Sequence, residues 1–109
     1  MTIKKAPTLK TKLAQPIAPD GARVSLRLYI AGNAPNSRLA IGNLTAICAE
    51  RLAGRYELDI IDVLIAPQRA LADGILVTPS LAVLGPGPAV RIVGNLNDRA
   101  GVLHALGIE

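Results

Sequence analysis

The hydrophobic pattern changes twice within residues 24–64, and these changes constrain the fold more than any other feature of the sequence. Apolar side chains occupy every second position of residues 24–30, which is the spacing of a strand with one buried face. Between residues 37 and 52 they recur at intervals of three and four, which predicts an amphipathic helix. Residues 56–64 end in a nearly continuous apolar run, typical of a strand covered on both faces. Together these segments predict a βαβ unit with a right-handed crossover.

The predicted first helix has signals for its start, its stop and its buried side. Asn36 or Ser37 can cap its N-terminus, and Gly54 can end it. The apolar stripe expected to face the core consists of Ile41, Leu44, Cys48 and Leu52.

The second half of the chain predicts a short helix followed by a strand. Residues 66–73 suit a helix with Pro67 at its first position, where the missing N–H has no partner to lose. Pro79 interrupts the next apolar run. A central strand could not spare that N–H, so we expect the third strand to begin at Ser80.

A hairpin and a last helix complete the predicted fold. The Gly-Pro repeat of residues 85–88 predicts a turn into a fourth strand, residues 90–93, and Asn97 can cap a final helix that ends near residue 106. The order βαβαββα is that of an α/β, thioredoxin-like fold. In that fold the proline entering the third strand is typically cis, and we expect this of Pro79.

Composition separates a basic tail from a nearly neutral domain. Residues 1–22 hold every lysine of the chain, contain three prolines and show no periodicity, so we expect a disordered tail followed by one domain, residues 23–109. The net charge of +4 therefore belongs mostly to the tail, which argues against a nucleic-acid-binding face. Trp and Phe are absent, so the core must be aliphatic and light, with a limited stability margin.

Targeting signals point to the cytoplasm and away from membranes. The N-terminal residues have no apolar stretch of the signal-peptide kind, and no apolar run approaches the length of a membrane span. A single cysteine, Cys48, cannot form an internal disulfide and fits a reducing compartment.

The sequence offers no candidate for catalysis, a metal or a cofactor. A thioredoxin-like enzyme needs a reactive thiolate just after the first strand, and residues 31–36 contain no sulfur. Cys48 falls on the apolar stripe of the first helix, where a structural thiol is expected. His104 has no second ligand near it in sequence. We therefore expect a protein that binds other proteins and is not an enzyme.

Several blocks of the sequence resemble one known family. Residues 26–37 read Leu-Arg-Leu-Tyr-Ile-Ala-Gly-Asn-Ala-Pro-Asn-Ser and resemble the L-x-L-Y-V-A-G-N-T-P-N-S opening of the KaiB circadian-clock family. Residues 56–64 are similar to its second strand. Residues 67–70 and 75–81 are similar to its N-P-Q-L-A and I-L-A-T-P-T-L segments, and residues 91–96 to R-I-I-G-D-L. The resemblance spans roughly residues 24–106 without a large gap.

The resemblance implies a non-enzymatic clock regulator without a cofactor. Family members switch between a self-associated resting state, a dimer or tetramer, and a thioredoxin-like monomer that docks on the ATPase ring of KaiC. Carried over to this chain, Gly94 and Asn95 match the Gly-Asp pair that influences the switch. The positions that match the partner-binding surface are Pro67, Gln68, Arg69, Leu71 and Asp73.

Departures from the family pattern leave other functions open. Asn95 replaces the usual Asp, the acidic C-terminal tail of many members is missing, and the lysine-bearing N-terminal tail is extra. One alternative is a KaiB-like sensor or adaptor module in signalling or stress response; such modules occur fused to histidine kinases, and no kinase sequence follows residue 109. A thioredoxin-like oxidoreductase would need a cysteine after the first strand, and nucleic-acid binding would rest on the tail alone.

Overall fold

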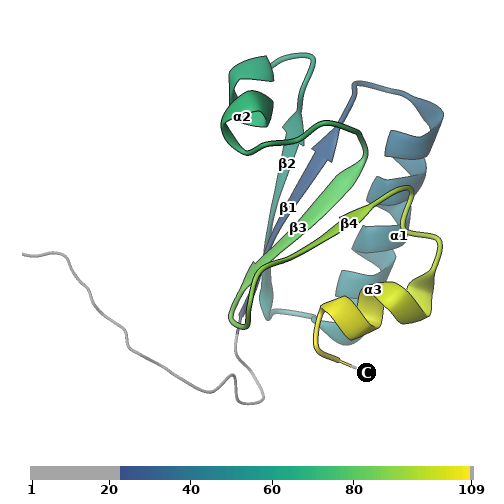
Figure 1. Ribbon diagram of the computed structural model, residues 1–109. Helices are drawn as coiled ribbons and strands as arrows, with labels where there is room; N and C mark the ends of the chain where they lie inside the picture. The colour runs from purple at the N-terminus through teal and green to yellow at the C-terminus, as the bar shows by residue number, and fades with distance from the viewer. Residues whose placement is uncertain (1–22, 109) are drawn as a thin grey trace, which may run out of the picture.

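The computed structural model describes residues 23–108, and within them the predicted order of elements is confirmed (Figure 1). The expected disordered tail, residues 1–22, lies outside the described residues, as does Glu109. The elements, in chain order, are β1 (Val24–Ile30), α1 (Pro35–Arg51), β2 (Tyr56–Asp62), α2 (Pro67–Ala72), β3 (Ser80–Gly85), β4 (Val90–Val93) and α3 (Arg99–Ala105).

The strands form one sheet of four in the order β2-β1-β3-β4. β1 runs parallel to β2, with Leu28 opposite Ile60, and antiparallel to β3, with Leu28 opposite Leu81. β3 and β4 form the predicted antiparallel hairpin. β1 and β3 are therefore the central strands, and β2 and β4 lie at the two edges of the sheet.

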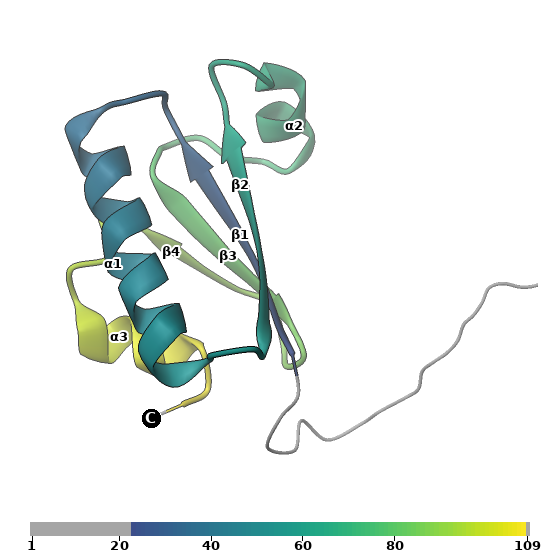
Figure 2. The same cartoon turned by 180° about the vertical axis from the view of Figure 1, so that it is seen from behind.

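The two faces of the sheet are covered unequally. α1 and α3 pack on one face, whereas α2 lies on the other face near the ends of β1 and β2 (Figures 1 and 2). The main core lies between β1, β3, α1 and α3, and its fully buried leucines each contribute about 1.5–3 kcal/mol relative to an exposed side chain. These leucines are Leu26, Leu28, Leu44, Leu52 and Leu81. The smaller cluster under α2 consists of Tyr29, Ile61, Ala70, Ile75 and Ala82.

The first helix begins earlier than the capping residues predict. α1 starts at Pro35, whose fixed φ suits a first turn, and no side chain caps its N-terminus. Ser37 is instead buried, and its Oγ accepts a hydrogen bond from the N–H of Ala31 at 3.0 Å. The apolar stripe is confirmed, with Ala40 and Ile47 added to its buried side. Gly54 follows the helix with φ +74°, a backbone conformation that favours glycine.

The second strand is shorter and less covered than its apolar run predicts. β2 ends at Asp62, whose Oδ1 accepts hydrogen bonds from the N–H groups of Gly32 and Leu64 at 3.0 and 2.9 Å. This side chain turns the backbone out of the sheet, so Leu64 lies in a loop. Ile61 is the one buried residue of β2, because an edge strand receives little cover from α1 or α2. The expectation of a strand covered on both faces was wrong.

The residue that caps the last helix lies one position after the predicted one. Asp98, not Asn97, caps α3, and its Oδ1 accepts from the N–H of Gly101 at 3.2 Å.

The Thr78–Pro79 bond is cis, where the sequence predicts a cis proline, and the Gly85–Pro86 bond is also cis. Among residues 23–108, no helix has the length and hydrophobicity to cross a bilayer.

Candidate protein-interaction surface around α2

α2 is a short helix that leaves most of its own surface uncovered. It has six residues, begins at Pro67 and buries one side chain, that of Ala70. Gly74, with φ +72°, ends it directly after the C-cap residue Asp73. A helix of this length buries little apolar area, so its position depends on contacts with neighbouring elements.

Four of the five predicted partner-binding positions are exposed. Pro67, Gln68, Arg69 and Leu71 are all exposed on α2, and Leu71 keeps 79% of its surface accessible. A large aliphatic side chain in that position contributes nothing to the core. Asp73 differs from the other four, because it is half-buried and its carboxylate contacts the sheet.

Exposed aliphatic side chains gather on α2 and on the two loops that flank it. We call them the α2 apolar surface: Leu64, Ile65, Leu71, Leu76 and Val77, which are 71%, 81%, 79%, 92% and 52% exposed. A hollow of about 140 Å³ lies beside them, and residues of both flanking loops line it, among them Val63 and Thr78. A concentration of exposed apolar side chains of this kind marks a protein-interaction surface.

Sequence reasoning found one of these five aliphatic residues and missed four. Leu64 and Ile65 extend the apolar run of β2, and Leu76 and Val77 lie in the run before Pro79, so both pairs resemble strand residues. The available signal was Pro79, which separates the apolar run of residues 75–77 from the strand that begins at Ser80.

A polar network joins α2 to the sheet. Arg69 Nη2 lies 3.1 Å from Asp59 Oδ2, and Arg27 reaches both Asp59 (Nε–Oδ2, 3.8 Å) and Asp73 (Nη1–Oδ2, 3.5 Å). The buried Tyr29 hydroxyl donates a hydrogen bond to Asp73 Oδ2. Burial, reinforced by this hydrogen bond, raises the pKa of Tyr29 above its ordinary value of 10.

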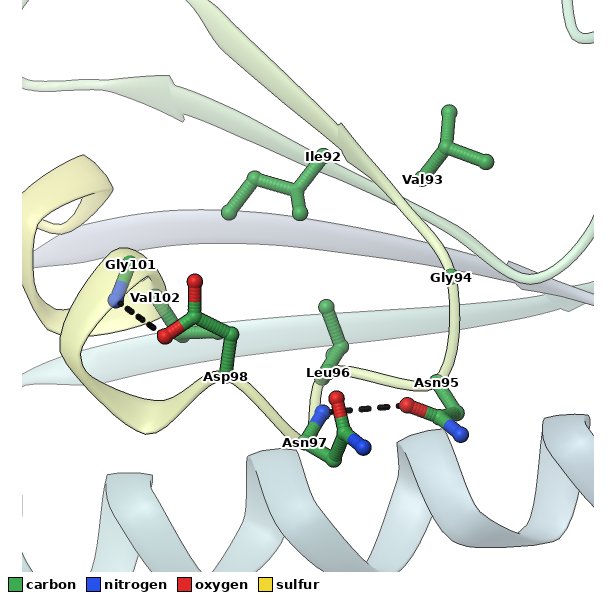
Figure 3. A pocket seen from close by; sticks show the side chains of 9 residues that line it. All are labelled: Ile92, Val93, Gly94, Asn95, Leu96, Asn97, Asp98, Gly101 and Val102. Atoms are coloured by element: carbon green, nitrogen blue, oxygen red, sulfur yellow. Dashed lines mark hydrogen bonds between the residues drawn. The ribbon is translucent and has the colours of Figure 1, made fainter.

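The loop that carries Gly94 and Asn95 forms a second hollow, of about 260 Å³, between β4 and α3 (Figure 3). Gly94 has φ +117°, and the buried Leu96 has φ +65°, a left-handed conformation that costs a leucine roughly 1–2 kcal/mol. Asn95 Oδ1 accepts from the N–H of Asn97 at 3.1 Å, and its carbonyl accepts from Asn43 Nδ2 at 2.8 Å. The loop is therefore held from α1 while it contains a strained residue.

The remaining candidates for chemistry are dispersed. Cys48 is fully buried, and burial raises the pKa of its thiol. His104 is exposed on α3. Within the described part of the chain, no three His, Cys, Asp or Glu side chains are close enough together to hold a metal ion.

Comparisons with known proteins agree with this architecture. The KaiB domain family model matches residues 27–108. The chain is 46% identical to the circadian clock protein KaiB3 of Synechocystis sp. over 89 residues, covering 82% of this chain and 87% of the relative. It is 51% identical to a circadian clock oscillator protein KaiB of Prochlorococcus marinus over 81 residues, covering 74% of this chain and 68% of the relative.

Solved structures show the same thioredoxin-like fold. The N-terminal domain of SasA from Synechococcus elongatus superposes with a TM-score of 0.65 at 24% identity, covering 91% of this chain and 96% of that domain. Mitochondrial thioredoxin 3 from Saccharomyces cerevisiae gives 0.63 at 15% identity, covering 79% of this chain and 78% of that protein. The family model and the clock-protein relatives, taken with the fold, show that the chain belongs to the KaiB family.

Proposed function

We propose that this chain is a non-enzymatic clock or timing regulator that docks on the ATPase ring of a KaiC-type protein through the α2 apolar surface. The observation that carries the proposal is the set of five exposed aliphatic side chains on and beside α2, in a chain whose relatives are named as clock proteins. We propose that the chain acts in the cytoplasm, where it would encounter the ATPase ring.

The α2 apolar surface supplies the affinity in this proposal, and its polar neighbours supply orientation. Burying an aliphatic side chain such as Leu71 contributes up to about 1.5–3 kcal/mol, so a few of these residues would carry most of the binding energy. Pro67, Gln68 and Arg69 border these aliphatic residues on the exposed side of α2. Charged groups at such a border set the rate and the orientation of encounter more than the affinity.

The test is size-exclusion chromatography with light scattering, on the chain alone and after hours with the host's KaiC-type ATPase and ATP. We expect a ring complex with the parent chain. Leu71→Asp should weaken it roughly tenfold or more, because a carboxylate would be buried at the interface. The matched control is Leu39→Asp, since Leu39 is 51% exposed on α1, on the other face of the sheet. Equal losses with both variants would contradict docking through α2.

A KaiB-like sensor or adaptor module outside a true clock is the second candidate. The observation that favours it is the structural match to the SasA N-terminal domain, because the two share a fold over 96% of that domain. The same chromatography separates the two, because an adaptor would stay folded and form no complex with an ATP-loaded ring.

We also propose that the resting state is self-associated, a dimer or tetramer, and that Gly94 and Asn95 lie where the chain rearranges. The left-handed Leu96 next to them supports this, since a strained loop lowers the gap to an alternative packing. The test is an amide correlation spectrum of the labelled chain. Two sets of signals in slow exchange for residues 80–108 are expected, and a single set at all concentrations would contradict the rearrangement.

A further inference from the structure

We propose that Asp73 is a positioning residue, which holds α2 on the sheet through Tyr29 and Arg27 and thereby presents the α2 apolar surface without touching the partner itself. The predicted effect of Asp73 on partner binding rests on the proposed function. The predicted effect of Asp73 on the attachment of α2 to the sheet does not, and it can be tested without a partner.

The contacts of α2 with its own sheet are few. Ala70 is its one buried side chain, and the chain that follows adds Ile75 to the small cluster around Tyr29 and Ile61. The flanking aliphatic residues, Leu64 and Leu76 among them, point away from that cluster, since both are largely exposed. Apolar packing alone therefore gives α2 a weak attachment, and the polar contacts at its C-terminal end become decisive.

Three side chains from the sheet converge on Asp73. Tyr29 donates its hydroxyl hydrogen to Asp73 Oδ2, and Arg27 Nη1 lies 3.5 Å from the same oxygen. Arg91, from β4, donates through Nη2 to the Asp73 carbonyl at 3.0 Å and through Nη1 to the Gly74 carbonyl at 3.4 Å. Side chains of β1 and β4 therefore both contact Asp73, the residue at which α2 ends.

Burial separates positioning from direct contact. Tyr29 is 1% exposed, so a docked partner cannot reach it. Removing its hydroxyl leaves the ring in the core and takes one hydrogen bond from the Asp73 carboxylate and one contact from Arg27. An effect of that change on α2 or on binding must therefore pass through Asp73 or through Arg27, which itself contacts the Asp73 carboxylate.

The first experiment is amide hydrogen exchange on the full chain. Tyr29→Phe should raise exchange of the amides of Asp73 and Ile75 roughly tenfold to a hundredfold, the loss expected for a hydrogen bond to a charged group. Exchange of the buried Leu44 amide in α1 should change much less. Glu57→Gln is the control, because it breaks an exposed ion pair with Arg23 on the same sheet. Unchanged exchange in α2, or an equal rise in α1, overturns the proposal.

The second experiment is a double-mutant cycle on ring binding. Tyr29→Phe and Asp73→Asn should each weaken binding, and the double variant should be little worse than either, because both act on one attachment. Weakening by Asp73→Asn with full binding by Tyr29→Phe would make Asp73 a direct contact and overturn the positioning role. If the parent chain itself does not bind the ring, the proposed function fails, and the exchange experiment alone decides the role of Asp73.

Discussion

Tyr29 and Cys48 show how burial fixes the chemistry of single residues in this chain. The core has no Phe or Trp, and Tyr29 brings a ring and a hydroxyl under α2, where Asp73 accepts its hydrogen. Cys48 lies in α1 among aliphatic side chains. Burial raises the pKa of both groups, so each is held in its neutral form. A neutral buried thiol is a packing residue and a poor nucleophile.

The raised pKa of Tyr29 predicts a loss of stability in alkali. The unfolded phenol ionises near pH 10 and the folded one at higher pH. The contribution of Tyr29 is therefore fully present below about pH 10 and declines as the pH rises through the folded pKa. The measurement is urea unfolding of the parent and of Tyr29→Phe at a series of pH values between about 8 and 11. The stability difference between them should shrink above about pH 10, and a constant difference would contradict the raised pKa.

At the scale of elements, the spacing of apolar residues predicted the central strand β1 correctly but misjudged where the edge strand β2 ends. Alternation in β1 works because one of its faces lies entirely against α1 and α3. The run at the end of β2 misled because a sequence does not show whether an apolar residue continues a strand or leaves the sheet. Asp62 decides this through its hydrogen bonds to Gly32 and Leu64, the first of which joins residues thirty positions apart.

The candidate site was predictable in part for the same reason. The position of α2 follows from local pattern, and the choice of Leu71 as a partner-binding position follows from the family resemblance alone. The inward role of Asp73 does not, because it depends on Tyr29, Arg27 and Arg91, which come from other strands. Sequence periodicity does not determine which side chains from distant segments come into contact.

Two glycines of the α1 region predict stability changes of opposite sign. Gly42 lies inside α1, and an added Cβ there meets nothing within 4 Å, so Gly42→Ala should stabilise the domain by about 0.5–1 kcal/mol. Gly54 is equally open but has φ +74°, so Gly54→Ala should destabilise it by about 1–2 kcal/mol. Thermal unfolding measures both, at roughly 4–8 °C per kcal/mol for a domain of this size. Shifts of the same sign would contradict the argument from backbone conformation.

At the scale of the whole molecule, the described domain combines paired charges with an unpaired apolar surface. Arg23, Arg27, Arg69 and Arg99 all contact a carboxylate within 4 Å. The face of the sheet under α1 and α3 holds the main core, and the face under α2 carries the α2 apolar surface at its margin. Among the described residues, Arg69 of α2 thus lies beside the α2 apolar surface.

Arg69 can act on a partner or only on Asp59, and two substitutions separate these roles. Arg69→Gln removes the cation and the 3.1 Å ion pair. Asp59→Asn breaks the same pair, together with the 3.8 Å contact to Arg27, and leaves the Arg69 cation exposed on α2. If Arg69 contacts the ring, Arg69→Gln should weaken binding roughly tenfold, more at low salt, while Asp59→Asn keeps parental affinity. Titration of the ring with each variant at two salt concentrations measures this. Equal weakening by both would place the importance of Arg69 in the attachment of α2 to β2, and no weakening by either would remove it from the interface.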